Sequence, residues 1–127
     1  ADGDYAENLR RFVLEARRSG ATVILVTPVH RRLFDGKGSP SKELAPYADS
    51  MTAVAKELST PVIDLYSSSE DVLEELGDSG SEALYAPGDR THFSEAGARL
   101  LAGMVARAAR DCDPRLRDAI LPDKPEN

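Results

Sequence analysis

Residues 22–28 read Thr-Val-Ile-Leu-Val-Thr-Pro, an apolar and mostly β-branched run that ends at a proline. Apolar and polar side chains do not alternate along this run, which is typical of a parallel strand covered on both faces. A second run of the same kind, residues 62–66 (Val-Ile-Asp-Leu-Tyr), follows Pro61. The sequence therefore predicts two strands, over 22–26 and 62–66.

The segment between the two strands has helical periodicity. Residues 47–58 repeat apolar side chains at the spacing of one helix face, which predicts a β-α-β unit with parallel strands and a right-handed crossover. Residues 30–41 are rich in Arg, Gly, Pro and Ser and predict a loop at the carboxyl end of the first strand. Open α/β sheets bind ligands at that edge, and Ser67 to Ser69 follow the second strand at the same edge.

Further helices are predicted over residues 5–16, around 72–76, and from Ser94, as N-cap, to about 108, with a loop over 77–88 and one turn near 116–120. The fold class is thus α/β, with about two parallel strands and four to five helices. The apolar positions expected to face the interior are Tyr5, Leu9, Phe12, Val13, Ala16, Tyr47, Met51, Val54, Ala55, Leu58, Val72, Leu73, Leu76, Leu100, Leu101, Met104, Val105 and Ala108.

Composition narrows the class of protein. With 127 residues, 41% hydrophobic and 30% charged, the chain is expected to form a single domain over 1–127, with 111–127 as a polar C-terminal extension. A net charge of -6 and a pI near 4.9 argue against nucleic acid and anionic membranes as partners. The single cysteine, Cys112, is interpreted as a small, half-buried side chain that cannot form an internal disulfide.

The candidate chemistry lies in residues 89–97, which read Asp-Arg-Thr-His-Phe-Ser-Glu-Ala-Gly. A carboxylate beside an imidazole can hold the ring in one tautomer and stabilise the imidazolium formed when the ring takes a proton. We therefore predict that His92 is a general base and Asp89 its orienting partner. The alternative is a surface loop without a catalytic role, in which Asp89 merely lies ahead of the following helix.

This block resembles the last motif block of the SGNH (GDSL-type) hydrolases, in which Asp-x-x-His is followed by Phe93-Ser94-x-x-Gly97-Ala98 and a long final helix. Residues 22–29, the pair Arg31-Arg32 and residues 62–66 make the sequence most similar to the rhamnogalacturonan acetylesterase branch, over about residues 5–108.

The resemblance implies a flavodoxin-like, three-layer α/β/α fold of which this chain has only a truncated part. The family's first block, a strand followed by Gly-Asp-Ser with the nucleophile, is missing, as are the blocks that supply the oxyanion-hole Gly and Asn. The resemblance also implies a carboxylic-ester hydrolase similar to an acetylesterase, acting on a small-molecule or carbohydrate ester, with polysaccharide acetyl esters as a candidate class.

Other polar residues have competing interpretations. Arg31, Arg32 and Arg90 are candidates for binding a uronate-like substrate carboxylate, against the alternative of unpaired surface arginines. His30 is interpreted as a solvated loop histidine, because two histidines and scattered carboxylates give no usual ligand spacing; no metal or cofactor is expected. Asp64 is interpreted as structural, capping or bonding a neighbouring loop.

The nucleophile cannot be assigned from the sequence. No serine near the expected active face has the context of a nucleophile elbow, so each is interpreted as turn or cap chemistry; these serines are Ser39, Ser41, Ser67, Ser68, Ser69 and Ser94. A catalytic serine would have to come from a position unusual for the family, from a second chain, or from sequence outside these 127 residues. The competing hypothesis is a non-catalytic, truncated hydrolase module that folds as an oligomer.

The missing strands also predict self-association. The 22–26 strand is expected to pair antiparallel with its own copy, completing a four-stranded sheet in a homodimer. The helix faces around Phe12, Val13 and Met104 would then close across the axis.

Overall fold

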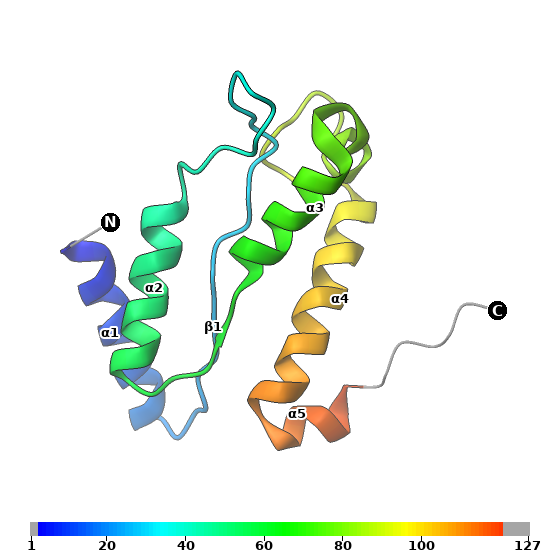
Figure 1. Ribbon diagram of the computed structural model, residues 1–127. Helices are drawn as coiled ribbons and strands as arrows, with labels where there is room; N and C mark the ends of the chain where they lie inside the picture. Colours follow the sequence, from blue (N-terminus) through cyan, green and yellow to red (C-terminus); the bar gives the residue numbers. More distant parts are fainter. Residues whose placement is uncertain (1–2, 121–127) are drawn as a thin grey trace.

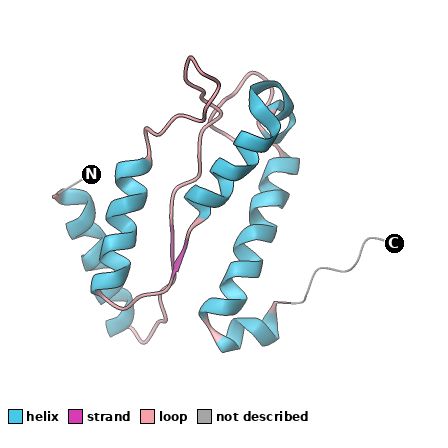
Figure 2. Ribbon diagram, in the orientation of Figure 1, coloured by secondary structure: helices cyan, strands magenta, loops and turns pink. Residues whose placement is uncertain are grey.

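The computed structural model describes residues 3–120, which form an α/β fold (Figures 1 and 2). Within that range there are two strands and five α-helices with one 3-10 turn. Their bounds are α1 (Asp4–Arg18), β1 (Leu25–Val26), α2 (Ala45–Glu57), β2 (Val62–Ile63), α3 (Leu65–Gly80), η1 (Glu82–Leu84), α4 (Glu95–Cys112) and α5 (Pro114–Ala119). Apart from the strand ends and the extent of α3, the order matches the sequence prediction.

The two strands are parallel, as predicted, but shorter. Leu25 pairs with Val62 and Val26 with Ile63. The Leu25 N–H donates to the Pro61 carbonyl at 2.9 Å and the Thr27 N–H to the Ile63 carbonyl at 3.0 Å. Because alternate residues of a strand direct their N–H groups to opposite edges, the Val26 N–H points to the other edge of β1, where no described strand pairs with it. The ladder comprises two residue pairs.

The helices lie on the two sides of this small sheet. Figure 1 shows α1 and α2 together on one side of β1 and α3 and α4 on the other, and α1 packs on α2 while α4 packs on α3, β2 and α5. Two helical layers around a parallel sheet agree with the predicted fold class.

The core is small, and several positions predicted to be interior are exposed. Val13, Val54 and Leu73 are among the fully buried side chains. In contrast, the exposed large apolar side chains include Phe12 (57%), Tyr47 (42%), Leu76 (43%) and Val26 (37%). In α4, the predicted interior residues Leu100, Leu101, Met104, Val105 and Ala108 are only half-buried.

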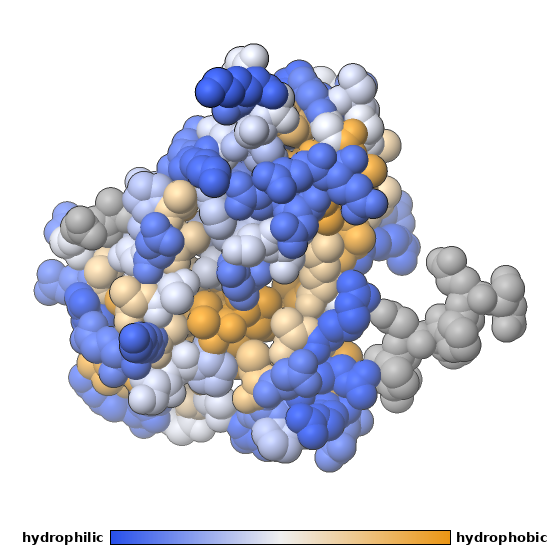
Figure 3. All heavy atoms as spheres, in the orientation of Figure 1, coloured by the Kyte–Doolittle hydropathy of each residue, from blue (hydrophilic) through white to orange (hydrophobic). Residues whose placement is uncertain are grey.

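These differences have a common physical reason. Helix stripes that are long enough to cover a wider sheet have only two strands to cover here, so part of each stripe faces solvent. The strand expected to be covered on both faces is likewise half-buried to exposed over residues 22–26. Figure 3 shows apolar atoms exposed in the middle of one face, in the region where Figure 1 places β1.

Two predicted boundaries near α3 were wrong. Asp64 ends the second strand early because its carboxylate accepts the Ser67 N–H at 3.0 Å and so caps α3, which places Ser67 to Ser69 in the helix rather than in a loop. The capping role of Asp64 is thereby confirmed. The helix also continues past residue 77, although Gly77 interrupts it with φ 68° and ψ -178°.

The C-terminal part agrees with the prediction. Ser94 caps α4 by accepting the Gly97 N–H at 3.2 Å, and a short helix, α5, covers the turn expected near 116–120. Cys112 is half-buried, and burial raises the pKa of its thiol. The expected polar tail lies outside the described residues from 121 onward. None of the helices in 3–120 has the length and apolar character needed to cross a bilayer.

Candidate active site

Asp89 organises the loop that carries His92. One carboxylate oxygen, Oδ2, accepts the Nδ1–H of His92 at 2.7 Å. The other, Oδ1, accepts the backbone N–H groups of Thr91 at 2.6 Å and His92 at 3.0 Å. The bonds from the His92 and Thr91 backbone N–H groups and from the His92 ring hold the pKa of Asp89 well below its ordinary value. The Asp89 carboxylate is therefore ionised at neutral pH, with the His92 ring hydrogen-bonded to it.

The imidazole of His92 is open to solvent on its other side. Its side chain is 79% exposed. With the proton of the neutral ring on Nδ1, the lone pair lies on Nε2, away from Asp89. Within residues 3–120, Asp89 is the only side chain bonded to this ring. The arrangement is an imidazole with one oriented nitrogen and one accessible nitrogen.

The two ends of the loop that carries Asp89 and His92 pair with each other. Tyr85 and Phe93 form an antiparallel bridge, and their rings pack with centroids 4.7 Å apart. The Ala86 N–H donates to the His92 carbonyl at 2.9 Å and the Ser94 N–H to the Leu84 carbonyl at 3.0 Å. These contacts bring the segment before Asp89 against the start of α4 and so limit the movement of the Asp89–His92 pair.

Gly97 permits this closure. An added Cβ at position 97 would overlap the Leu84 carbonyl oxygen and would lie 2.9 Å from the Leu84 carbonyl carbon and 3.1 Å from Cδ1 of Phe93. Only a glycine lets the first turn of α4 approach η1 this closely.

Tyr85 connects the loop to the sheet. Its hydroxyl donates to the His30 carbonyl at 2.9 Å. The side chain is 4% exposed, and burial raises its pKa to about 12. Because His30 follows β1, this bond places the Asp89–His92 loop at the carboxyl end of the strands, where α/β folds bind their ligands.

His30 itself is buried, so its interpretation as a solvated loop histidine was wrong. The residue is 1% exposed and its ring packs on Tyr66 of α3 with centroids 4.0 Å apart. Its backbone N–H donates to the Ser69 hydroxyl oxygen at 3.0 Å, and its Nδ1 lies 3.2 Å from the Tyr66 carbonyl oxygen. Burial lowers the pKa of His30. The first turn of α3 covers the ring, and nothing in the local sequence around His30 shows this.

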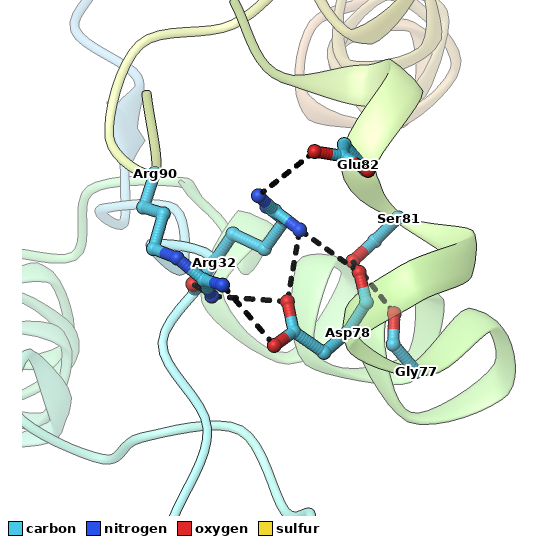
Figure 4. Close-up of polar contacts among 6 residues, drawn as sticks. All are labelled: Arg32, Gly77, Asp78, Ser81, Glu82 and Arg90. Atoms are coloured by element: carbon cyan, nitrogen blue, oxygen red, sulfur yellow. Dashed lines mark hydrogen bonds and ion pairs between the residues drawn. The ribbon is translucent and has the colours of Figure 1, made fainter. Parts of the chain in front are cut away.

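All three arginines predicted to bind substrate have carboxylate partners. Arg31 lies 3.2 Å from Glu43 at the surface. Arg32 is buried, with 7% of its side chain exposed, and pairs with Asp78 at 2.8 Å. Arg90 is 45% exposed and also pairs with Asp78, at 2.9 Å. Figure 4 shows the last two guanidinium groups meeting at one carboxylate.

The arginines are therefore not the unpaired surface residues of the alternative interpretation. Their role in substrate binding stays a prediction, and the structure offers Arg31 and Arg90, rather than the buried Arg32, to a ligand. Among the described residues, no group of three or more His, Cys, Asp or Glu side chains is arranged to hold a metal ion.

Comparisons with known proteins show what the whole chain is similar to. No protein-family model matches the sequence. The rhamnogalacturonan acetylesterase RhgT of Bacillus subtilis (strain 168) is 36% identical over 92% of this chain and 56% of RhgT. The crystal structure of YxiM from Bacillus subtilis matches with a TM-score of 0.70 and 33% identity, over 91% of this chain and 32% of that chain.

A third match is the structure of a catalytic mutant of Axe2, an acetylxylan esterase from Geobacillus stearothermophilus, with a TM-score of 0.63 and 25% identity over 83% of this chain and 45% of that chain. The chain resembles the C-terminal part of an SGNH-type esterase. The predicted resemblance is therefore confirmed. The chain spans about half the length of RhgT.

The chain contains the tripeptide Gly77-Asp78-Ser79. It lies at the C-terminal end of α3 rather than after a strand, and its aspartate is engaged by two arginines. Within residues 3–120, the Ser79 hydroxyl has no hydrogen bond to His92. The tripeptide therefore lacks the setting of a nucleophile block.

Four of the six candidate serines, Ser67, Ser68, Ser69 and Ser94, have hydroxyl groups bonded to nearby protein groups. Ser67 donates its hydroxyl to Asp64 Oδ2 at 2.7 Å, and Ser69 is buried against His30 and Tyr66. Ser94 donates its hydroxyl to the Ala83 carbonyl at 2.7 Å. No serine hydroxyl in the described range is bonded to His92, so the structure brings together His92 and Asp89 but no serine with them.

Proposed function

We propose that this chain carries the acid–base pair of a carbohydrate ester hydrolase, with His92 as the base and Asp89 as its orienting partner. The observation that carries the proposal is the three-bond arrangement around the Asp89 carboxylate, which leaves Nε2 of an exposed imidazole free to accept a proton. The names of the similar proteins, rhamnogalacturonan acetylesterase and acetylxylan esterase, support acetyl esters of polysaccharides as the substrate class.

The proposed chemistry uses each atom of the pair. His92 Nε2 takes the proton of a hydroxyl nucleophile as the oxygen attacks the ester carbonyl. The resulting imidazolium is stabilised by Asp89, which stays charged because its pKa is lowered. The ring then gives its proton to the leaving alkoxide, and a water molecule is activated in the same way to release acetate.

The hydroxyl nucleophile is proposed to come from outside residues 3–120. The support is that the described serines are bonded elsewhere or are not bonded to His92. The proposed source is a further polypeptide segment, because a second copy of the chain would carry only the same serines. The test below detects the activity when that segment is expressed together with the chain.

The open edge of β1 supports a homodimer. The edge presents the backbone groups of Val26, which is 37% exposed. Apolar atoms are exposed in the region of β1 (Figures 1 and 3). Pairing with a second β1 would satisfy these groups, and an obligate interface of this kind buries roughly 2,000 Å² or more. Light scattering of the wild type should give the mass of a dimer. Ile24→Pro, which removes a backbone donor, and the gentler Val26→Lys should both abolish it, and a well-folded wild-type monomer would contradict the dimer.

The catalytic proposal is tested by acetate release from acetylated xylan or acetylated rhamnogalacturonan. These alkyl esters are preferable to nitrophenyl acetate, whose good leaving group allows a simple exposed imidazole to attack it. Wild type, His92→Ala and Asp89→Asn are compared, with Glu57→Gln as a matched carboxylate-to-amide control at a surface ion pair.

Release by the wild type and Glu57→Gln, with a loss of at least about 100-fold in His92→Ala, is the expected result. Equal rates in the wild type and His92→Ala would overturn catalysis through this pair. Absence of release by the wild type would favour the competing hypothesis of a non-catalytic module.

A further inference from the structure

Asp78 joins three parts of the chain that are distant in sequence. Its Oδ1 accepts from Nη1 of Arg32 at 2.8 Å and from Nη1 of Arg90 at 2.9 Å, and its Oδ2 lies 3.2 Å from Nη2 of Arg90 (Figure 4). The Asp78 backbone carbonyl also accepts from Nη1 of Arg32 at 3.0 Å. One residue at the end of α3 therefore binds both the segment after β1 and the loop before α4.

The two arginine segments are also joined to each other. The Arg32 N–H donates to the Arg90 carbonyl at 2.7 Å, and Nη1 of Arg90 donates to the Arg32 carbonyl at 2.9 Å. Arg90 is thus held at both its backbone and its side chain. Because Arg90 directly follows Asp89, its position sets the direction of the backbone that leads to Thr91 and His92.

Asp78 is itself rigidly placed. Gly77 adopts φ 68°, a left-handed conformation that side chains other than hydrogen disfavour, and so turns the end of α3 toward the arginines. Ser81, which is fully buried, donates its hydroxyl to the Gly77 carbonyl at 2.7 Å and lies 3.1 Å from the Asp78 carbonyl. The carboxylate is presented from a fixed backbone rather than from a flexible loop.

We propose that Asp78 is a positioning residue for the Asp89–His92 pair and acts through Arg90. This inference rests on the proposed function of that pair. The Asp78–Arg90 contact holds the loop so that the Thr91 and His92 N–H groups reach Asp89 Oδ1. Without the contact, the loop samples other conformations, and the carboxylate orients the imidazole for a smaller fraction of the time.

A purely structural role is the competing explanation, because Arg32 is buried. Without Asp78, its only other carboxylate neighbour in the described chain is Glu82, at 3.8 Å, so Asp78→Asn also lowers stability. Arg90→Gln separates the two roles. It removes the contacts of the Arg90 side chain with Asp78 and with the Arg32 carbonyl, while the Asp78–Arg32 pair stays in place.

The test measures the loop directly by NMR on the wild type, Asp78→Asn, Arg90→Gln and the control Glu57→Gln. The readouts are the water-exchange rates of the Thr91 and His92 amides and the fraction of the Nδ1–H tautomer of neutral His92. In Asp78→Asn and Arg90→Gln, exchange should rise about tenfold, as expected for one weakened hydrogen bond, and the Nδ1–H fraction should fall. The control should match the wild type.

Unchanged exchange and tautomer in Arg90→Gln would overturn the proposal, whether or not Asp78→Asn folds. If exchange and tautomer change in Asp78→Asn but not in Arg90→Gln, the role of Asp78 is to pair with Arg32 and stabilise the fold. That result would also overturn the proposal. Neither readout involves ester hydrolysis, so failure of the acetate-release test leaves this result independent. Where acetate release is present, Asp78→Asn should lower kcat with little change in KM.

Discussion

Replacing Gly97 with alanine should destabilise the protein where α4 packs against η1, at the base of the loop that carries Asp89 and His92. The new Cβ would overlap the Leu84 carbonyl oxygen and would lie 3.1 Å from the Phe93 ring. Both are backbone or packed ring atoms, so relief requires the start of α4 to move away from η1 by about 1 Å. That movement pulls on the bond from the Ser94 N–H to the Leu84 carbonyl.

The magnitude follows from three contributions. Overpacking costs about 1–3 kcal/mol, and the weakened Ser94 bond about 1 kcal/mol more. Alanine offsets about 1 kcal/mol of this through its better helix propensity. We therefore expect Gly97→Ala to lower the free energy of unfolding by about 2 kcal/mol.

Gly103→Ala is a matched control in the same helix. There the nearest atom to the new Cβ is Nη1 of Arg107 at 3.4 Å, the far end of a flexible side chain. This variant should gain about 0.5–1 kcal/mol from helix propensity, because nothing has to move.

Urea unfolding followed by circular dichroism measures both variants, and amide spectra of residues 84–97 show whether the loop has shifted. A Gly97→Ala protein as stable as Gly103→Ala would refute the reasoning. It would mean that the close approach between α4 and η1 is not required for the fold.

Four further predictions concern Asp89, Tyr85 and the serines. The hydrogen bonds from His92 and Thr91 hold the folded-state pKa of Asp89 below its ordinary value of 3.8. The contribution of Asp89 to stability is therefore present above about pH 4 and is lost as the pH falls through the folded-state pKa. Urea unfolding between pH 3 and 7 should show the stability gap between wild type and Asp89→Asn shrinking below about pH 4. Tyr85→Phe removes the donor to the His30 carbonyl and should cost about 1–3 kcal/mol in the same assay. In the wild type, burial raises the pKa of Tyr85 to about 12 from an ordinary value of 10.0. The contribution of Tyr85 to the free energy of unfolding is therefore complete below pH 10 and declines above it. A spectrophotometric titration should show one tyrosine ionising near pH 12. A serine-directed fluorophosphonate should leave every serine of residues 3–120 unlabelled, Ser79 included, because activation of a hydroxyl needs a base within about 2.6–3.2 Å. A labelled peptide found by mass spectrometry would identify the nucleophile and would contradict its proposed origin outside this range.

The sequence by itself determined the features that depend on short-range interactions. Helix periodicity located the helices, and the β-branched runs located the parallel strands. The caps at Asp64 and Ser94 involve partners three residues away, as does the contact between Asp89 and His92. Such contacts form within one turn of chain, so the residue order is enough to predict them.

Tertiary structure alone decided the environment of the site. The burial of His30 depends on Tyr66 and Ser69, and the pairing of Arg32 depends on Asp78, 46 residues away. Exposure of the apolar stripes depends on how many strands the helices have to cover. These features are produced by the approach of distant segments, whose partners no local pattern specifies, and the Asp78 cluster that holds the Asp89–His92 loop exists only once those segments meet.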